Sequence, residues 1–157
     1  IPTFQKYFGL TGRSSLLDVG CAKGFMLHDL VELIPGITVS GVDVSDYAIA
    51  HAMDNIKSKV QVADASDLPF ADNSFDVVIA INTIHNLDRD DCAQALREIE
   101  RVSRKGSFIT VDAYRNDDEK ERMFAWNLTA KTIMSVEEWV SFFEEVGYTG
   151  DYFWFIP

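Results

Sequence analysis

The chain has 157 residues with 25 acidic and 14 basic side chains, so its formal net charge is −11. That length fits one domain, residues 1–157, with a full hydrophobic core. The charge would repel nucleic acid and anionic membrane surfaces, which are bound through clustered Lys and Arg. No apolar run reaches transmembrane length and no basic-then-apolar leader is present. The first residue is Ile1 rather than Met, which a fragment, a trimmed chain or an incomplete gene would explain.

The chain contains two cysteines, Cys21 in a predicted turn and Cys92 on a predicted helix. Neither has another metal ligand at a suitable spacing, so no metal site is predicted. Unpaired thiols are typical of a reducing compartment, and we therefore expect a cytoplasmic protein.

The predicted elements alternate between strand and helix along the chain. Residues 16 to 25 contain a short buried strand, a turn of small residues and the start of an amphipathic helix. Strands are expected at 16–19, 37–43, 60–63, 75–82, 107–112 and 148–156. Helices are expected at 25–34, 47–57, from Asp90 or Asp91 to about Arg104, and at 136–146, where Ser135 and Glu138 form a capping box. The charged and aromatic segment 117–130 is expected to be a helix beside the substrate cavity.

This alternation predicts an α/β fold with an open, mostly parallel, doubly wound sheet and helices on both faces. In such sheets ligands bind outside the carboxyl ends of the strands, where the strand order reverses. Four polar segments fall at these ends, and their convergence is the main sequence signal for a site. They are 18–24, Asp43, Asp64 and Asn82.

The turn after the first strand indicates which cofactor the site binds. A dinucleotide fingerprint needs small residues at its first, third and sixth positions, and Phe25 stands at the sixth. The pattern Asp18-x-Gly20-x-Ala22-x-Gly24 instead resembles the first motif of class I, Rossmann-like S-adenosylmethionine-dependent methyltransferases. Ala22 departs from the glycine that the family usually has there. Alanine costs little there if its φ stays negative, so we expect cofactor binding to survive.

Two further acidic residues support this resemblance. Asp43 follows the second strand, and a carboxylate there can accept hydrogen bonds from both ribose hydroxyls, although dinucleotide enzymes use the same acid. Asp64-Ala65, followed by 66–70 and 73–76, is similar to the acidic loop and the entry of the fourth strand in the small-molecule, type 11-like group of methyltransferases.

The resemblance implies a role for each matching residue. Asp64 would accept a hydrogen bond from the adenine amino group, the Ala65 N–H would donate to a ring nitrogen, and Val44 would pack on the adenine face. Asp18, the turn carbonyls and Asn82 would hold the methionine ammonium. The implied binding residues for S-adenosylmethionine, or for its product S-adenosylhomocysteine, are Asp18, Gly20, Cys21, Ala22, Gly24, Asp43, Val44, Asp64, Ala65 and Asn82.

Candidates for the chemistry of the acceptor are fewer. A sulfonium is already activated, so the enzyme mainly aligns the reactants and removes a proton where the nucleophile needs it. His85 follows the fourth strand and is the candidate general base, with packing or loop orientation as its alternative role. Further candidates for lining the substrate pocket are Asp112, Tyr114 and Trp126. By contrast, His28 and His51 are expected to be structural or exposed, and Lys23 to be solvated, since the P-loop pattern is incomplete.

The leading hypothesis is an S-adenosylmethionine-dependent methyltransferase that acts on a small molecule. The stretch after the fourth strand, 82–85, does not match the Asn/Asp-Pro-Pro-aromatic pattern of enzymes that methylate nucleic-acid bases. Two alternatives remain open: a cofactor-binding module without catalysis, and a nicotinamide-dependent oxidoreductase.

The ends of the chain lead to two further expectations. The family usually has a longer helical cap, of which 1–15 is a short piece, and a seventh, antiparallel strand for which no sequence remains. The aromatic residues 152–155 would form an association-prone edge, so we expect a homodimer.

Overall fold

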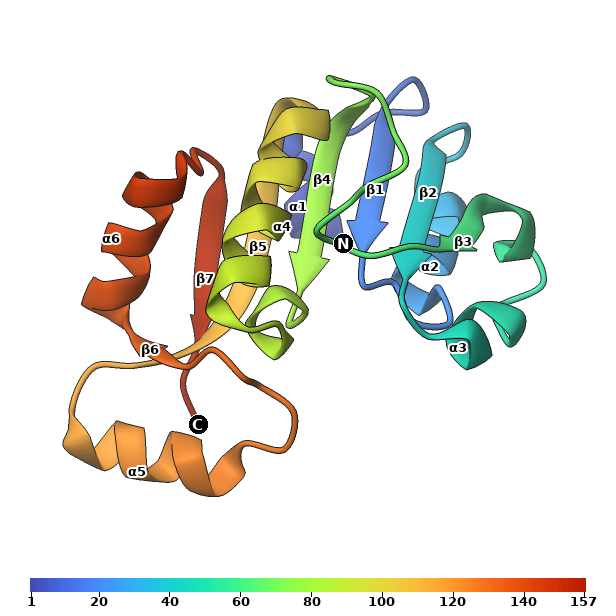
Figure 1. The fold of residues 1–157 in the computed structure, drawn as a ribbon. Coiled ribbons are helices and arrows are strands. Elements are labelled where there is room, and N and C mark those ends of the chain that lie inside the picture. The colour runs from blue at the N-terminus through green and yellow to red at the C-terminus, as the bar shows by residue number, and fades with distance from the viewer.

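The computed structural model describes residues 1–157 and contains seven strands in one sheet, with helices on both of its faces (Figure 1). The predicted α/β doubly wound fold is therefore confirmed. In chain order the elements are α1 (Pro2–Phe8), β1 (Ser15–Val19), α2 (Phe25–Leu33), β2 (Thr38–Asp43), α3 (Asp46–Ala50), η1 (Lys57–Lys59), β3 (Val60–Val62), β4 (Phe75–Ile81), η2 (Ile84–Asn86), α4 (Arg89–Val102), β5 (Ser103–Tyr114), α5 (Asp117–Trp126), β6 (Met134–Ser135), α6 (Val136–Val146) and β7 (Asp151–Phe155).

The strand order is β3-β2-β1-β4-β5-β6, and β7 pairs with β5. The chain adds strands outward from β1 in one direction and, after β3, returns to place β4 on the other side of β1. A crevice at the carboxyl ends of β1 and β4 is the expected ligand position for this topology. The arrowheads of these strands point to the same edge of the sheet in Figure 1.

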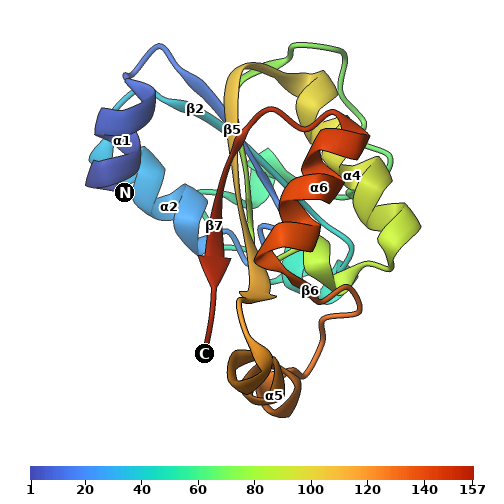
Figure 2. The same cartoon turned by 90° about the vertical axis from the view of Figure 1, so that its left-hand side faces the viewer.

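Each face of the sheet has its own hydrophobic core. Figure 2 shows α1 and α2 on one face and α4 and α6 on the other. The larger core surrounds Trp139 of α6 and includes Leu96 and Ile99 of α4. The smaller core contains Leu27 and Leu30 of α2. Both sides of β1 and β4 are covered, which explains why their sequences are almost continuously apolar.

Helix capping explains where the predicted boundaries hold and where they move. The capping box between Ser135 and Glu138 is confirmed, and α6 ends at Gly147 as expected. The predicted cap of α4 was wrong: Asp88, not Asp90 or Asp91, accepts a hydrogen bond from the Asp91 N–H, because Asp90 and Asp91 already lie in the first helical turn.

The helix predicted at 47–57 was also too long. It is capped by Ser45, but it ends at Ala50. After the end of α3, the Met53 N–H donates to the Lys23 carbonyl at 3.0 Å. This hydrogen bond to a distant segment replaces the bond that a continuing helix would make to the carbonyl four residues earlier.

The strands differ from the expectation mainly in length and number. β5 covers 103–114 rather than 107–112, because it pairs with β4 from Phe75 onward. The last strand, β7, is shorter than predicted at 151–155 and runs parallel to β5. The strand missing from the prediction is β6, which has two residues and pairs in parallel with the end of β5. All strand pairs of the sheet are parallel, so the implied antiparallel strand is not among them.

Two peripheral helices lie in different places relative to the carboxyl edge. α1 packs against the sheet through Phe4, whose ring lies 4.8 Å from that of Phe108 on β5. α5 lies beyond the carboxyl ends of β5 and β7 (Figures 1 and 2). None of the helices combines the length and the apolar character that a membrane crossing requires.

Candidate active site

The turn between β1 and α2 has an unusual backbone conformation. Gly20, Ala22 and Gly24 all have positive φ, at 82°, 48° and 78°. A Cβ at Gly20 would overlap the side chain of Thr83, and one at Gly24 would approach Ile56 Cγ2 to 2.7 Å. Glycine is therefore required at both positions for space as well as for conformation.

The condition of a negative φ at Ala22 is not met. The residue lies in the left-handed region, which side chains other than glycine rarely adopt. Its N–H donates to Asp43 Oδ2 at 2.9 Å, and this hydrogen bond helps to hold the strained conformation. Ala22 thus adopts a conformation that glycine takes more readily.

Asp43 connects the turn to the exit of β2. Its Oδ2 accepts from Ala22 N–H and its Oδ1 from Ser45 N–H, both at 2.9 Å. Each carboxylate oxygen can accept more than one hydrogen bond. Asp43 is therefore fixed in orientation and still has acceptor capacity for hydroxyl groups of a ligand.

A cavity of about 260 Å³ opens beside this turn at the carboxyl edge of the sheet. Five of the residues predicted for the cofactor line it, and they come from the ends of β1, β2, β3 and β4. These five are Gly20, Asp43, Val44, Ala65 and Asn82. These five residues therefore meet at one edge of the sheet, as the sequence predicted, and their role in cofactor binding stays a prediction.

Sequence reasoning missed the other lining residues, among them Thr83, Asn86 and Leu87, which follow the end of β4. They belong to or border η2, a short helical turn directly after β4. Their position next to Asn82 in the sequence was the available signal. The approach of Thr83 to Gly20 depends on the short turn, which no periodic pattern could reveal.

Asp18 directly precedes Val19 and Gly20, which line the cavity, and its side chain is buried. Its carboxyl group makes no hydrogen bond within the chain, yet no polar side-chain atom is completely enclosed without a partner. Its oxygens are therefore reachable by a ligand. Burial, and secondarily the charge of Asp43, raise the pKa of Asp18 to about 7. A bound cation would satisfy this carboxylate.

The other predicted cofactor residues border the cavity without lining it. Asp64 is exposed, and its Oδ1 accepts hydrogen bonds from the Ser66 N–H at 2.8 Å and the Ser66 hydroxyl at 2.7 Å. The side chain of Cys21 is buried in the smaller core, so only its backbone can contact a ligand.

The loop that contains Asp64 and Ala65 is attached to α4. Glu98 accepts from the Leu68 N–H at 2.8 Å. Arg101 donates to Glu98 at 2.7 and 2.8 Å, to the Phe70 carbonyl at 2.7 Å and to the Leu68 carbonyl at 3.1 Å. The position of this loop is therefore set by the last turns of a helix about thirty residues further along the chain.

Residues expected to be structural or solvated lie away from the cavity. His28 Nδ1 is 2.9 Å from Asn55 Oδ1, and His51 contacts the Tyr47 carbonyl and ring. The Lys23 ammonium lies 5.5 Å from the centre of the Tyr47 ring.

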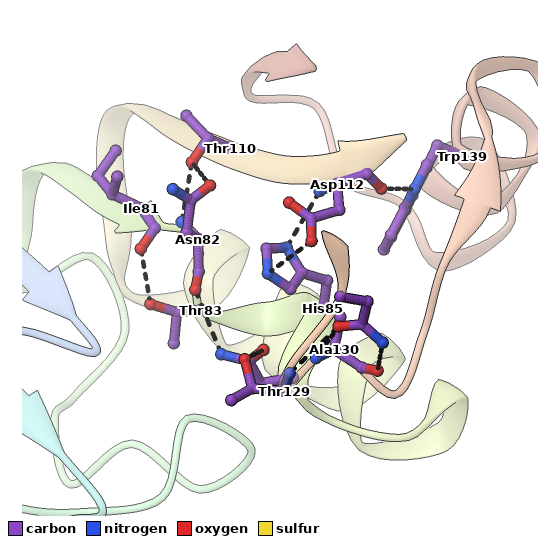
Figure 3. Close-up of polar contacts among 11 residues, drawn as sticks. Ile81, Asn82, Thr83, His85, Thr110, Asp112, Thr129, Ala130 and Trp139 are labelled. Atoms are coloured by element: carbon purple, nitrogen blue, oxygen red, sulfur yellow. Dashed lines mark hydrogen bonds and ion pairs between the residues drawn. The ribbon is translucent and has the colours of Figure 1, made fainter. Parts of the chain in front are cut away.

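The candidate base His85 is buried next to Asp112 (Figure 3). Its Nδ1 accepts a hydrogen bond from the Asp112 backbone N–H at 3.1 Å, and its Nε2 is 3.7 Å from Asp112 Oδ2. The Trp139 indole N–H donates to the Asp112 carbonyl at 3.0 Å. Burial lowers the pKa of His85, although Asp112 opposes this, and burial raises the pKa of Asp112.

A second cavity of about 520 Å³ lies under α5 and includes His85 and Asp112. Trp126 also lines it, as the sequence predicted, whereas Tyr114 does not. Asn82 lines both cavities, so they adjoin at the end of β4. The structure thus has two neighbouring compartments at the carboxyl edge of the sheet.

Comparison with known proteins finds a family that matches more than half of the chain. Residues 17–111 match a protein family described as Methyltransferase domain. The match covers the region from the middle of β1 to β5 and includes all of the predicted cofactor residues.

Three similar proteins show the range of relatives. The O-methyltransferase resE of Aspergillus sclerotiorum is 32% identical over 85% of this chain and 54% of its own length. The tRNA (carboxymethyluridine(34)-5-O)-methyltransferase of Arabidopsis thaliana is 32% identical over 83% of this chain and 31% of its own length. A solved S-adenosylmethionine-dependent methyltransferase from Methanosarcina mazei superposes with a TM-score of 0.74 at 19% identity, covering 93% of this chain and 84% of that one. The chain spans about half or less of the curated relatives' length.

Proposed function

The chain belongs to the methyltransferase domain family, and on this basis we propose that it is an S-adenosylmethionine-dependent methyltransferase with a small-molecule acceptor. The observation that carries the cofactor assignment is the pair of carboxyl groups at the first turn. Asp18 is only 5% exposed and its carboxyl group accepts no hydrogen bond from the chain, and Asp43 is fixed by two backbone N–H groups. One carboxylate suits an ammonium group, and the other suits a pair of hydroxyls.

The residues present fit the cofactor. Asp43 would bind the ribose hydroxyls, Val44 and Ala65 would contact the adenine, and Asp64 would accept from its amino group. Asp18 and Asn82 would hold the methionine ammonium. When bound, the cofactor supplies an activated methyl group on a sulfonium.

The small-molecule acceptor is supported by the second cavity and by the charge. A cavity of about 520 Å³ adjoins the cofactor compartment, and its volume suits an acceptor of small-molecule size. The net charge of −11 disfavours a polyanion. One relative is nevertheless named for a tRNA acceptor, so tRNA belongs among the substrates to be tested.

Two alternatives make different predictions. The nicotinamide-dependent oxidoreductase rests only on the strand–turn–helix and on Asp43, and Phe25 argues against it. The non-catalytic module would bind the cofactor but would transfer no methyl group to any acceptor.

Calorimetric titration with S-adenosylhomocysteine and with NAD tests the cofactor assignment. We expect binding of the first ligand alone, and a loss of at least about tenfold in affinity in Asp43→Ala, equivalent to about 1.4 kcal/mol. Asp54→Ala, at an exposed position after α3, is the matched control and should bind as the wild type does. Binding of NAD, or of neither ligand, would reject the assignment.

Methyl transfer is then tested with cofactor labelled in the methyl group. Label should move to a small molecule in a metabolite panel and not to total tRNA. Binding of the cofactor without transfer to either would favour the non-catalytic module.

A further inference from the structure

The cavity under α5 contains a carboxyl group without a hydrogen-bond partner. The side chain of Asp112 is only 10% exposed, and its nearest approach to His85 is 3.7 Å, beyond hydrogen-bond distance. No polar side-chain atom is completely enclosed without a partner, so its oxygens are reachable from the cavity that it lines. Because an unpaired buried carboxyl is costly, a ligand that donates a hydrogen bond would bind favourably here.

His85 is not free to take a proton from such a ligand. Because its Nδ1 accepts from the Asp112 N–H, we assign the ring proton to Nε2. If Nδ1 carried the proton, its N–H would face the Asp112 backbone N–H, and neither donor would have an acceptor. The His85 carbonyl also accepts from the Lys131 and Thr132 N–H groups. Hydrogen bonds therefore hold both the backbone and the ring of His85. His85 is therefore a positioning residue that fixes the backbone of Asp112.

The side chains of Asp112 and Asn82 lie on the same side of the sheet edge, and Asn82 lines both cavities. Thr110 and Asp112 are two residues apart on β5, so their side chains share one face of the sheet. The Thr110 hydroxyl donates to Asn82 Oδ1 at 2.7 Å, and Asn82 lines both cavities. Figure 3 shows one carboxyl oxygen of Asp112 directed to the His85 ring and the other toward the Asn82 side. A ligand bound to Asp112 would thus lie beside the cofactor compartment.

The rest of the cavity wall is apolar or uncharged. The rings of Trp126 and Phe155 lie 5.7 Å apart and border it together with Leu128. No Lys, Arg or Glu lines the cavity, so a carboxylate or phosphate on the ligand would find no counter-charge. The wall therefore suits an aromatic or apolar body that carries a hydrogen-bond donor.

We propose that this cavity binds the methyl acceptor, that the acceptor presents a hydroxyl group on an uncharged aromatic or apolar body, and that Asp112 accepts the hydroxyl hydrogen. The proposal rests on the proposed function and names the acceptor class for it. A hydroxyl is favoured over an ammonium because the acceptor must be a neutral nucleophile with a free electron pair.

The proposed reaction transfers one proton to Asp112 and one methyl group to the acceptor oxygen. The acceptor O–H bond breaks and its proton passes to a carboxylate oxygen of Asp112. The electron pair on the acceptor oxygen forms the new bond to the methyl carbon, while the sulfonium–methyl bond breaks and its electron pair stays on sulfur. Burial raises the pKa of Asp112, which makes its carboxylate a stronger base toward the hydroxyl.

The test compares three probes on the 157-residue chain, with and without S-adenosylhomocysteine: 2-naphthol, 2-methoxynaphthalene and 2-naphthylmethylammonium. Dissociation constants are measured by NMR titration, with the Trp126 indole N–H as the reporter for the cavity. We expect naphthol to bind at least about tenfold more tightly than the methyl ether, which cannot donate to Asp112. In Asp112→Asn this ratio should fall to about two or less, since the acceptor is no longer charged.

Asp118→Asn, an exposed aspartate on α5, is the matched control and should keep the wild-type ratio. A general loss of structure would weaken naphthol and ether equally, so the ratio isolates the contact with Asp112. An unchanged ratio in Asp112→Asn, no saturable binding of naphthol, or tighter binding of the ammonium probe would each overturn the proposal.

The two proposals can fail separately. Asp112→Asn should bind S-adenosylhomocysteine within about twofold of the wild type, an effect well below 1.4 kcal/mol. If the wild type binds no S-adenosylhomocysteine but naphthol binds through Asp112, the cofactor assignment fails alone. If S-adenosylhomocysteine binds and naphthol does not, the acceptor site fails alone.

The positioning role of His85 has its own spectroscopic test. Ring ¹⁵N shifts should show the Nε2-protonated neutral tautomer at pH 8, because burial lowers the pKa of His85 and Nδ1 accepts from the Asp112 N–H. A charged ring, or a proton on Nδ1, would contradict the assignment.

Discussion

Ala22 adopts a φ of 48°, a conformation that disfavours a Cβ by about 1–2 kcal/mol. Ala22→Gly removes this strain, although glycine also adds conformational entropy to the unfolded chain, about 0.5–1 kcal/mol. We expect the free energy of unfolding to rise by up to about 1 kcal/mol, measured by denaturant titration.

Ala48→Gly is the matched substitution within helix α3, where φ is not positive. It should lower the free energy of unfolding by about 0.5–1 kcal/mol. Equal destabilisation by the two variants would show that Ala22 is not strained.

Asp18 should make stability depend on pH in an unusual direction. Its pKa of about 7 lies above the ordinary value of 3.8, so between these values the folded state binds more protons than the unfolded state. Stability therefore falls as pH rises through this window, by up to about 1.4 kcal/mol per unit. In Asp18→Asn this contribution disappears, and the variant should be the more stable protein at pH 8.

Denaturant titrations at pH 5 and pH 8 measure this effect, with Asp54→Asn as the exposed control. A wild type whose free energy of unfolding changes no more between these pH values than that of Asp18→Asn would contradict it.

At the scale of elements, the acidic loop depends on its attachment to α4. Glu98 and Arg101 bind the backbone of Leu68 and Phe70, so the loop is positioned by side chains and not by strand pairing. Glu98→Gln removes the charge from two hydrogen bonds with Arg101 and should cost about 1–3 kcal/mol of stability. It should also weaken S-adenosylhomocysteine binding about tenfold, because Asp64 and Ala65 lose their placement.

Glu100→Gln makes the same change on the same helix, where the side chain contacts Thr149 instead of the loop. Calorimetry of both variants with S-adenosylhomocysteine and with its inosine analogue separates placement of the adenine from general damage. The Glu98→Gln loss should be larger for the adenine ligand, whereas equal losses for both ligands would indicate damage without a positioning role.

At the scale of the whole molecule, the free edge of β7 is aromatic. Phe153 is 62% exposed and Tyr152 41%, and edge strands of this kind associate readily. The homodimer expected from the sequence stays a prediction. Sedimentation should show a dimer that Phe153→Lys dissociates, while Phe124→Lys on α5 leaves it intact. A monomeric wild type whose β7 amides are protected from exchange would contradict it.

The sequence by itself determined the fold class, the order of the elements and the residues at the strand ends. Periodicity and capping are local properties, and the carboxyl ends of parallel strands must share one edge. This is why Gly20, Asp43, Ala65 and Asn82 were placed correctly at one cavity.

Only the tertiary structure decided the remaining features. The early end of α3, the positive φ of Ala22 and the attachment of the acidic loop to Glu98 depend on hydrogen bonds between distant segments. The occupied Nδ1 of His85 and the unpaired carboxyl of Asp112 arise because η2 and β5 meet at the same sheet edge. These contacts join residues that are far apart in the sequence, so no local sequence pattern predicts them. The burial and the hydrogen-bond partners of the site residues therefore follow from the packing of the whole chain.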